Sequence, residues 1–515
     1  MSKRKYIYVL LSVFTIFLPA ILHAEPYEGF TLFGSNNSRN NYLVDMSNTV
    51  VHSWASTVSG NYSYYLLEDG SLLRTAMSGN SFNGGGAQGA VEKLDWDGVR
   101  TWFYTYSNTS HRSHHDIEPM PNGNVLMIAW ELKSSSQAVA AGLSRSAAIW
   151  PDHIIEVQPT GATTGDIVWE WHAWDHLVQD YNASRSNYGV VNDHPELLDI
   201  NTYTGTGGGG GDWMHVNAVS YNPDLDQIVF SSHNLNEIYI IDHSTTTAEA
   251  ASHSGGRWGK GGDFLYRWGN PANYDETGTR VFDVVHCAWW VPAGLPGAGH
   301  LLAFNNRQTA RASMIVELVL PVDSLGYYLR DSSTAYGPAS PVWSYSGTGF
   351  YSQHLGGNQR LPNGNTIISE STSGFLFEVD STGQTVWSYN RGGEIVRVLR
   401  YGMSDSAVSR LVPSSAKETT SIPVSVALTQ NYPNPFNAST KLGVNLNATT
   451  RVKLAIYNTL GEQVALVVNG KLVAGEHEFE WRAVDRNGRL LQSGVYLSVL
   501  EAGSYKQTKK MVLVK

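Results

Sequence analysis

Between Tyr27 and Ser409 the chain alternates short hydrophobic runs with polar turn signals. In Tyr64–Ala76, Met120–Trp130 and Leu361–Ser371, Asp-Gly or Asn-Gly stands between runs with apolar residues at alternate positions. Tight hairpins use such dipeptides because Gly and Asn accept a positive φ at little cost. The pattern therefore predicts antiparallel strands joined by short turns, and an all-β region.

A second element recurs along the same region. It is a hydrophobic strand that carries Trp with a second aromatic or charged residue two positions on, and it stands at Gly165–Trp174, Asp263–Pro271, Ala339–Gly347 and Thr382–Asn390. Imperfect four-strand units of about 40–60 residues are typical of a β-propeller. We therefore predict a propeller over residues 25–410, with six blades as the expected number. A β-helix, which would show a shorter and stricter period, and a pair of β-sandwiches are the alternatives.

The first 24 residues have the layout of a secretory signal peptide. A basic stretch, Lys3–Lys5, precedes an apolar run, Tyr6–Leu22, and Ala24 offers a small residue for cleavage. A transmembrane anchor is the alternative, but polar residues interrupt the run before it reaches the ~20 apolar residues that a span needs. No later run is long enough to cross a bilayer. The prediction is an exported protein without an integral membrane segment after signal removal.

The pattern changes again after Arg410. Residues 411–426 are rich in Ser, Thr and Pro and show no strand alternation, which predicts a linker. Beyond it, the runs Val452–Asn458, His477–Ala483 and Gly494–Gly503 alternate clearly. Residues 427–515 are therefore predicted to form a small C-terminal β-sandwich.

Composition narrows the functional classes. The 515 residues are 42% hydrophobic and 16% charged, so the chain can bury a large core. Lys and Arg number 35 against 45 Asp and Glu, and a net charge of −10 argues against nucleic acid as a partner. The single cysteine, Cys287, excludes an internal disulfide and any cysteine-based metal cluster. The glycine-rich segments Gly207–Gly211 and Gly255–Gly262 lack the ending of a phosphate-binding loop, so no nucleotide site is visible.

The C-terminal unit carries a specific pattern of turn and aromatic residues. It comprises Tyr432–Phe436, Tyr457, Leu460–Gly461, Ala474–His477, Trp481, Asp485–Gly488 and Ser493–Tyr496. Through these residues the unit closely resembles the type A sorting domain of the type IX secretion system. The resemblance implies a diderm bacterium, passage through the periplasm, and a final place at the outer-membrane surface or in the medium. The secretion machinery is then a partner, and the tail is an address that is commonly removed.

Residues 28–400, approximately, resemble the bacterial arylsulfotransferase family that works without a nucleotide sulfate donor. The strongest segments are His114–Leu126, Val168–Tyr181, Asp212–Asp242, Asp263–Pro271, His300–Arg307 and Gln359–Ile368. The resemblance implies a six-bladed propeller with its active site at the central channel. A histidine there takes a sulfuryl group from a phenyl sulfate ester and passes it to a phenol, and no cofactor is expected.

The chemistry of the residues is compatible with that activity. A sulfate ester reacts through a loose, in-line transition state, much as in phosphoryl transfer. The protein must supply a neutral nucleophile, positive charge for the equatorial oxygens and an acid for the leaving phenolate. The 17 histidines and several arginines can provide all three without a metal, and the many Trp and Tyr residues can stack on an aryl group.

Three histidines are the catalytic candidates. His215, in DWMHVN, matches a family position that lines the site, and a histidine bonded between blades is the alternative. His286 stands in VVHCAWW, where relatives resemble Q-H-D-A-H-W, so Cys287 and Trp289 replace Asp and His. That departure implies an altered substrate, a weaker activity or none. His354 lies just before a strand of the last blade, where a nucleophilic histidine is expected.

Arg307 and His115 are the substrate-binding candidates. Arg307 is the expected clamp for the sulfuryl oxygens, with Arg311 as its neighbour and a surface salt bridge as the alternative role. His115 opens a blade and either points into the channel or is held in the blade packing by Asp116.

No metal site is predicted. His172 and His176 are four residues apart and would share one face of a helix, but no third ligand is in view. Cys287 has no recognisable base partner, so a small buried core residue is the favoured interpretation.

Two functional hypotheses remain. The first is a secreted arylsulfotransferase acting on a small phenolic sulfate donor and a phenol acceptor. The second is a non-catalytic surface propeller that binds glycan or aromatic ligands. The first predicts that several histidines and an arginine, with His215, His286, His354 and Arg307 as the residues to measure, converge on one mouth of the channel. The second predicts that the histidines do not converge and that the channel is narrow or plugged.

Overall fold

A computed structural model shows two compact units, Met1–Arg410 and Leu411–Lys515. The structure describes residues 24–79, 82, 84–202, 211–309, 311–323, 325–331, 334–412, 426–446, 449–473, 475–484, 489–503 and 505–514. The predicted signal peptide, except Ala24, and nearly all of the predicted linker lie outside these residues. Within them, no helix is long and apolar enough to span a membrane.

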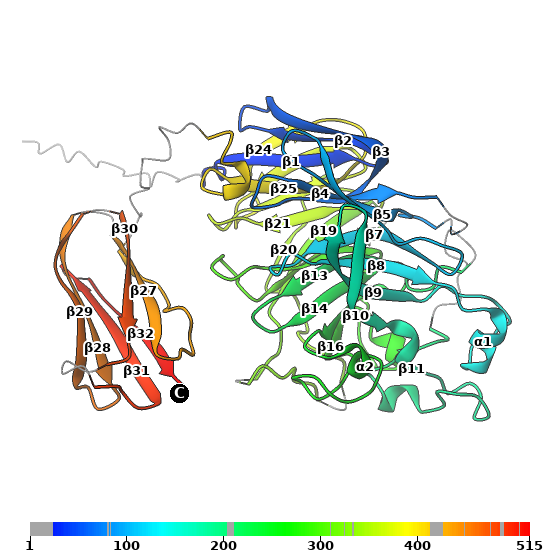
Figure 1. The fold of residues 1–515 in the computed structure, drawn as a ribbon. Helices are drawn as coiled ribbons and strands as arrows, with labels where there is room; N and C mark the ends of the chain where they lie inside the picture. The colour runs from blue at the N-terminus through cyan, green and yellow to red at the C-terminus, as the bar shows by residue number, and fades with distance from the viewer. Residues whose placement is uncertain are drawn as a thin grey trace, which may run out of the picture. The chain divides into compact units, whose positions relative to one another are not determined.

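The first unit consists almost entirely of strands (Figure 1). They are β1 (Gly29–Ser35), β2 (Ser38–Val44), β3 (Val50–Leu66), β4 (Leu72–Met77), β5 (Gly89–Leu94), β6 (Arg100–Thr105), β7 (His111–Pro119), β8 (Val125–Glu131), β9 (Asp152–Gly161), β10 (Thr164–His172), β11 (Leu177–Val178), β12 (Leu198–Asp199), β13 (Val216–Asn222), β14 (Gln227–Ser232), β15 (Glu237–Asp242), β16 (Tyr266–Trp268), β17 (Val285–Trp290), β18 (Leu301–Thr309), β19 (Ala312–Leu318), β20 (Trp343–Tyr345), β21 (Gly357–Arg360), β22 (Thr366–Glu370), β23 (Phe375–Val379), β24 (Thr385–Asn390) and β25 (Ile395–Gly402). The helical segments are α1 (Ser135–Ala140), α2 (Thr247–Ala250), η1 (Ala173–Asp175), η2 (Val191–Asp193), η3 (Pro271–Tyr274) and η4 (Ser406–Val408).

Apart from the short parallel pair β11–β12, the strands of the first unit form antiparallel sheets. Four sheets have four strands each, namely β7–β10, β13–β16, β17–β20 and β21–β24. A seven-stranded sheet runs β25-β1-β2-β3-β4-β5-β6. The predicted Asp69-Gly70 turn joins β3 to β4, with Gly70 at a φ of 81° that a residue with a side chain rarely adopts.

Six strands, one from each of the four-stranded sheets and two from the seven-stranded sheet, form a ring. Strands β3, β7, β13, β17, β21 and β25 contact one another in that cyclic order. This arrangement confirms the predicted β-propeller. Counting β3 in two sheets, with Val50–Ala55 beside β2 and Tyr64–Leu66 beside β4, gives six groups of four strands. The number of six blades stays a prediction.

The last strand closes the ring. Strand β25 pairs antiparallel with β1, with Leu399 opposite Leu32, so the two ends of the unit share one sheet. Buried side chains of neighbouring sheets pack together: Phe33 of β1, for example, lies in one cluster with Ile367 of β22 and Leu376 of β23. Burial of both sheet faces explains why β8 (VLMIAWE) and β15 (EIYIID), in the middle of their sheets, carry hydrophobic runs.

The second unit contains two antiparallel sheets that enclose one core. Its strands are β26 (Ala427–Leu428), β27 (Ser439–Leu446), β28 (Thr450–Asn458), β29 (Gln463–Leu472), β30 (Gly475–Arg482), β31 (Gly494–Ala502) and β32 (Tyr505–Leu513). The sheets run β26-β27-β30 and β29-β28-β31-β32. Leu442, Ile456, Trp481 and Leu500 are core members from four of the strands, which confirms the predicted sandwich.

Candidate functional site in the central channel

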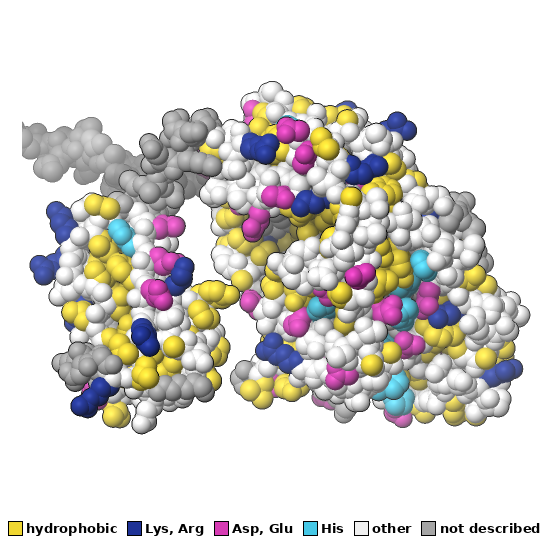
Figure 2. Space-filling view, viewed as in Figure 1, with side chains coloured by type: hydrophobic (Ala, Val, Ile, Leu, Met, Phe, Trp, Pro, Cys, Tyr) yellow, Lys and Arg dark blue, Asp and Glu magenta, His cyan; other side chains and the backbone are white. Residues whose placement is uncertain are grey.

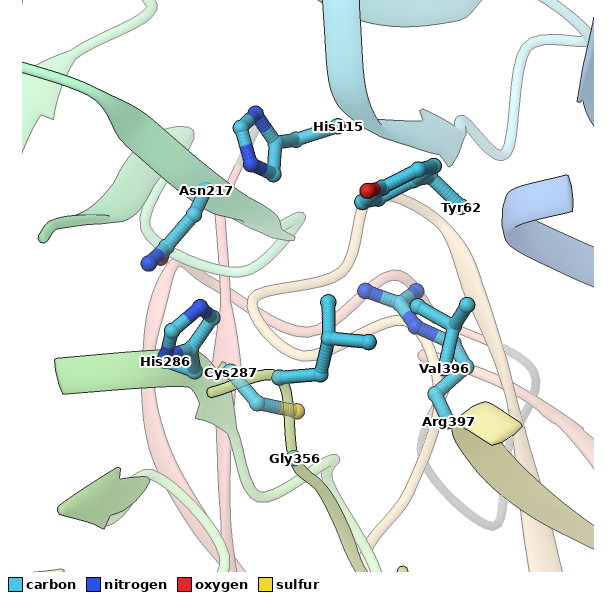
Figure 3. Close-up of a pocket in the computed structure, with 9 residues that line it drawn as sticks. Tyr62, His115, Asn217, His286, Cys287, Gly356, Val396 and Arg397 are labelled. Atoms are coloured by element: carbon cyan, nitrogen blue, oxygen red, sulfur yellow. The ribbon is translucent and has the colours of Figure 1, made fainter. Parts of the chain in front are cut away.

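The ring strands and the loops that lead into them surround a small cavity (Figure 3). Its lining residues are Tyr62, His115, Asn217, His286, Cys287, Leu355, Gly356, Val396 and Arg397. Every ring strand, or the residue just before it, contributes at least one of them. The volume is about 20 Å³, which is room for about one water molecule.

The backbone around this cavity is strained in a regular way. Non-glycine residues with positive φ occur at Asn61 (85°), His115 (48°), His215 (54°), Cys287 (50°) and Leu355 (58°). The pairing register also shifts beside the cavity, between Ser113 and Ile117 where β7 pairs with β8, and between His286 and Trp289 where β17 pairs with β18. Such conformations cost about 1–3 kcal/mol each and cluster at functional sites. The bulges re-aim side chains that an unbroken strand would point elsewhere.

Four histidine rings form a continuous arc beside the cavity. The ring centroids of His115 and His215 are 4.5 Å apart, those of His215 and His233 4.8 Å, and those of His233 and His286 5.7 Å. In Figure 3 the rings of His115 and His286 lie on one side with Asn217 between them, and Tyr62 and Arg397 lie across from them. We call His115, His215, His233 and His286 the histidine arc.

The arc joins three predicted residues to one that was not predicted. His115, His215 and His286 were candidates, and the structure brings them together. His233 was missed, although it directly follows the buried strand β14 and lies in one of the family-like segments. A histidine ring placed directly after a strand with the apolar centre Ile-Val-Phe was the available signal.

The side-chain amide of Asn306 determines the tautomer of His286. Asn306 donates from Nδ2 to the carbonyl oxygens of Ser352 (3.0 Å) and Leu355, so its Oδ1 must face His286. Nδ1 of His286 lies 2.6 Å from that oxygen and therefore carries the proton, which leaves a lone pair on Nε2. Burial, together with the nearby His233, holds the pKa of His286 well below its usual value. His286 is thus a neutral imidazole.

His215 is oriented by a buried carboxylate. Its Nδ1 hydrogen-bonds Oδ2 of Asp212, whose other oxygen accepts a hydrogen bond of 3.0 Å from Nε1 of Trp130. The His215 side chain is 15% exposed, and Asp212 is fully buried. An imidazole held in this way can give and take a proton at Nε2.

His115 is fixed by a second buried group. Its Nδ1 lies 2.8 Å from Nδ1 of His114, and Nε2 of His114 lies 2.8 Å from Oδ1 of Asp152. Burial and the neighbouring histidines hold the pKa of both imidazoles well below the usual range, whereas burial and the nearby Asp212 raise the pKa of Asp152. His115 is therefore a neutral hydrogen-bonding group at the cavity wall.

Asp116 does not hold His115, which was one of the two expected roles. Instead Oδ2 of Asp116 lies 2.7 Å from Nη2 of Arg397, and both side chains are almost completely buried. Arg397 also donates to the hydroxyl of Tyr65 at 2.8 Å. It places a compensated positive charge at the cavity wall, which nothing in the local sequence indicated.

The other candidates lie outside this cavity. The His354 side chain is 50% exposed, and its Nε2 lies 2.6 Å from Oε1 of Glu394. Arg307 is half-buried, and its charge contributes to lowering the pKa of His233, so it lies within electrostatic reach of the arc. Arg311 is exposed.

The two departures from the family pattern occupy different places. Cys287 lines the cavity, but burial raises the pKa of its thiol to about 11, so it stays protonated at neutral pH. Trp289 stacks on Tyr65 with ring centroids 6.1 Å apart, and the guanidinium of Arg397 lies 5.2 Å from its ring. Trp289 therefore packs beneath the cavity rather than in it.

The opposite ends of the ring strands surround a larger cavity. It measures about 560 Å³, and its lining includes Tyr65, Tyr221, Trp289, Trp290 and Glu118. Burial raises the pKa of Glu118 to about 8, so this carboxyl is largely protonated at neutral pH. The channel therefore has one end rich in histidine and one rich in aromatic rings.

Comparison with protein families gives two matches. A model described as Arylsulfotransferase (ASST) matches residues 24–400. A model described as Secretion system C-terminal sorting domain matches residues 430–515. The second match confirms the predicted sorting domain of the type IX system and indicates secretion or a place at the outer-membrane surface. Among curated proteins, none matches the chain.

Several solved structures are similar in outline. A protein of unknown function from Bacteroides caccae is 12% identical, with a TM-score of 0.40 over 72% of this chain and 98% of that one. A putative 6-phosphogluconolactonase from Bacteroides fragilis is 11% identical, with a TM-score of 0.36 over 73% and 98%. The β-propeller domain of Myceliophteria thermophila Cps50 (Swd1) is 10% identical, with a TM-score of 0.33 over 75% and 95%.

Proposed function

Because the chain belongs to the arylsulfotransferase family over residues 24–400, we propose that it transfers sulfuryl groups between phenolic compounds through His286. The tautomer of His286 carries this proposal. Its Nδ1 proton is bound to Asn306, so Nε2 presents a lone pair in a neutral, buried ring at the channel. A neutral imidazole is the nucleophile that an anionic sulfate ester requires.

In the first step, Nε2 of His286 attacks the sulfur of an aryl sulfate. The N–S bond forms as the S–O bond to the aryl group breaks, and the leaving phenolate takes a proton from His215. Asp212 stabilises the imidazolium form of His215 that serves as this acid. The sulfuryl group then resides on His286, whose Nδ1 proton stays with Asn306.

In the second step, a phenol takes the place of the leaving product. Its oxygen attacks the sulfur, the S–N bond breaks, and His215 accepts the phenol proton. His286 returns to its neutral form, and no nucleotide or redox partner is consumed. Atoms and charge therefore balance over the two steps.

The surroundings suggest how substrate binds. The cavity has a volume of about 20 Å³ and holds about one water molecule, so the aryl ring lies outside it and only an oxygen of the sulfuryl group enters it beside His286. Arg307 supplies positive charge near His233, and His115 offers a hydrogen bond to a sulfuryl oxygen. His354 is not needed in this scheme because Glu394 engages it at the surface.

Export completes the proposal. Residues 1–24 direct the chain through the inner membrane, and the C-terminal domain directs it onward through the type IX machinery. The donor and acceptor are then small phenolic compounds outside the cytoplasm, where nucleotide sulfate donors are scarce.

Turnover of 4-nitrophenyl sulfate by the purified protein, with and without phenol, tests the function. We expect nitrophenolate release to increase with phenol, together with formation of phenyl sulfate. Release that is independent of acceptor would indicate hydrolysis at the same site. No release from folded protein with several aryl sulfates would overturn the proposal in favour of a binding propeller.

The depressed pKa of His286 predicts activity in mild acid. An imidazole with the usual pKa of about 6.5 would be only about one-tenth neutral at pH 5.5. Since burial lowers the pKa of His286, its neutral form persists as the pH falls. We expect kcat/KM at pH 5.5 to be no more than about threefold below its value at pH 7.5, measured in quenched assays. A tenfold fall with a midpoint near 6.5, in protein that stays folded by circular dichroism, would contradict this.

Gly86 predicts a steric effect on His115. Its φ is 77°, and a Cβ atom there would lie 2.1–2.3 Å from three atoms of the His115 ring. Gly86→Ala must therefore displace that ring, and we expect kcat/KM to fall about 10–100-fold. Gly98→Ala is the matched control, because Gly98 has a φ of 82° with open space around its Cβ position. Equal activities of the two variants, both folded, would show that the position of His115 is unimportant.

A further inference from the structure

A second group of side chains with metal-ligand chemistry lies outside the lining of the channel cavity. His176, His253 and Asp263 each place one ligand atom within 4.8 Å of the others. Nδ1 of His176 and Nδ1 of His253 both lie 2.8 Å from the same oxygen, Oδ1 of Asp263. We propose that these three residues bind a divalent transition-metal ion, and that Zn²⁺ is the ion bound in the native protein.

The hydrogen bonds of His176 carry the argument. Its Nε2 lies 2.8 Å from the carbonyl oxygen of Ala250, which can only accept, so Nε2 carries a proton. In a neutral ring, Nδ1 then presents a lone pair toward Oδ1 of Asp263, and two acceptors 2.8 Å apart repel each other. A cation bound to both atoms from one side, at about 2.0–2.2 Å from each, would remove the conflict. Metal-binding histidines commonly donate their other N–H to a backbone carbonyl in this way.

The packing holds two of the ligands rigidly. The His176 ring is fully buried and stacks on Trp171, with ring centroids 5.6 Å apart and planes 4° apart. Nε1 of Trp171 donates to the carbonyl oxygen of Gly262, the residue before Asp263, at 2.7 Å. Asp263 and His176 are therefore oriented by the same tryptophan. Rigid ligands lower the entropic cost of binding an ion.

The third ligand leaves a path to solvent. The His253 side chain is 62% exposed, so an ion can enter and a water molecule can complete its coordination. Figure 2 shows histidine side chains at the surface in the region where Figure 1 places α2 and β11. His253 follows α2, and His176 lies between η1 and β11.

The ligand set selects the type of ion. Two imidazoles and one carboxylate suit Zn²⁺ and its transition-metal neighbours, whereas Mg²⁺ and Ca²⁺ prefer oxygen ligands alone. The ion would tie the glycine-rich segment Gly255–Gly262 to the sheet that ends in β10. This cross-link would suit an exported protein whose single cysteine cannot form an internal disulfide.

The pairing of His172 with His176 considered from the sequence does not occur. His172 lies 3.3 Å from Glu131 and stacks on His153, with ring centroids 4.9 Å apart. The partners of His176 come instead from a later loop, beyond the reach of any local spacing rule.

Zinc binding by the full-length chain tests the proposal. After removal of metal with a chelator, the protein is titrated with ZnCl₂ against a chromophoric chelator, and with CoCl₂ by visible absorption. We expect His253→Ala to weaken the site at least about 100-fold, since losing a ligand should cost no less than losing its outer-shell partner. The wild type should bind one more ion per chain than this variant and gain thermal stability with Zn²⁺.

Two further variants define the outcome. His194→Ala is the matched control, since His194 is also exposed and bonds Glu196 through Nδ1 at 3.1 Å outside any such group, and it should bind zinc as the wild type does. Asp263→Asn should lose the site as His253→Ala does. The histidine arc is a second potential sink for zinc, so the difference between variants is the readout. Equal zinc binding by the wild type and His253→Ala would overturn the proposal and leave a protonated His176 in its place.

Discussion

Replacing His286 with alanine is expected to abolish sulfuryl transfer, lowering kcat/KM for 4-nitrophenyl sulfate at least about 10³-fold. The reason is that Nε2 of this ring is the only protein atom in the scheme that bonds to sulfur. Its neutral state and its tautomer both depend on the buried position beside Asn306. The measurement is nitrophenolate release with saturating phenol. In addition, donor without acceptor should label the wild-type peptide that contains His286, and not the variant.

His354→Ala is the control for that result. His354 is half-exposed and bound to Glu394, so we expect its loss to change kcat/KM by less than about twofold. His286→Gln serves as a second variant because it keeps a polar group beside Asn306 if alanine destabilises the chain. An inactive His354→Ala variant together with an active His286→Ala variant would transfer the nucleophile assignment to His354.

Replacing Arg397 with methionine is expected to lower the apparent free energy of unfolding by about 3–5 kcal/mol. The change leaves the Asp116 carboxylate buried without its partner and removes the hydrogen bond to Tyr65. Urea unfolding followed by tryptophan fluorescence measures the loss. Strand β25, which carries Arg397, pairs with β1 and so closes the ring of strands. The stability of the ring should therefore depend on the ion pair between Arg397 and Asp116.

Arg410→Met provides the comparison. Arg410 and Asp97 are 3.9 Å apart with both side chains more than half exposed, and such pairs contribute about 0–1 kcal/mol. Adding Asp116→Leu to Arg397→Met should recover part of the loss, since no charge is then left unpaired. If Arg397→Met and Arg410→Met unfold at the same urea concentration, the buried pair does not stabilise the ring.

Local sequence was sufficient for the elements and for the overall architecture. The Asp69-Gly70 turn, the strand beginning near Val452 and the strand at Gly494–Gly503 all depend on neighbours within a few residues. Alternation along a strand determines which side chains face a core, so hydrophobic patterning alone predicts sheets and turns. The sorting domain was recognisable for the same reason, since its pattern lies within one compact unit.

The site was predicted only in part. His115, His215 and His286 were identified one by one, and the structure places them in one arc. His233 and Arg397 were missed because the residues around them resemble ordinary strand ends. One of the two expected roles of Asp116 was to hold its chain neighbour His115, whereas the group that it binds lies 281 residues away.

What the sequence by itself determined is therefore the local structure: where strands and turns form, which faces are hydrophobic, and which family the propeller and the tail resemble. The packing of whole sheets into a closed ring determined the contacts between residues far apart in the sequence. It brings β25 beside β1 and β3, and so places Arg397 against Asp116 and His286 near His115. It also sets Asp263 against His176. Contacts between residues so far apart depend on how whole sheets pack, because propensity and periodicity act only over short stretches of chain.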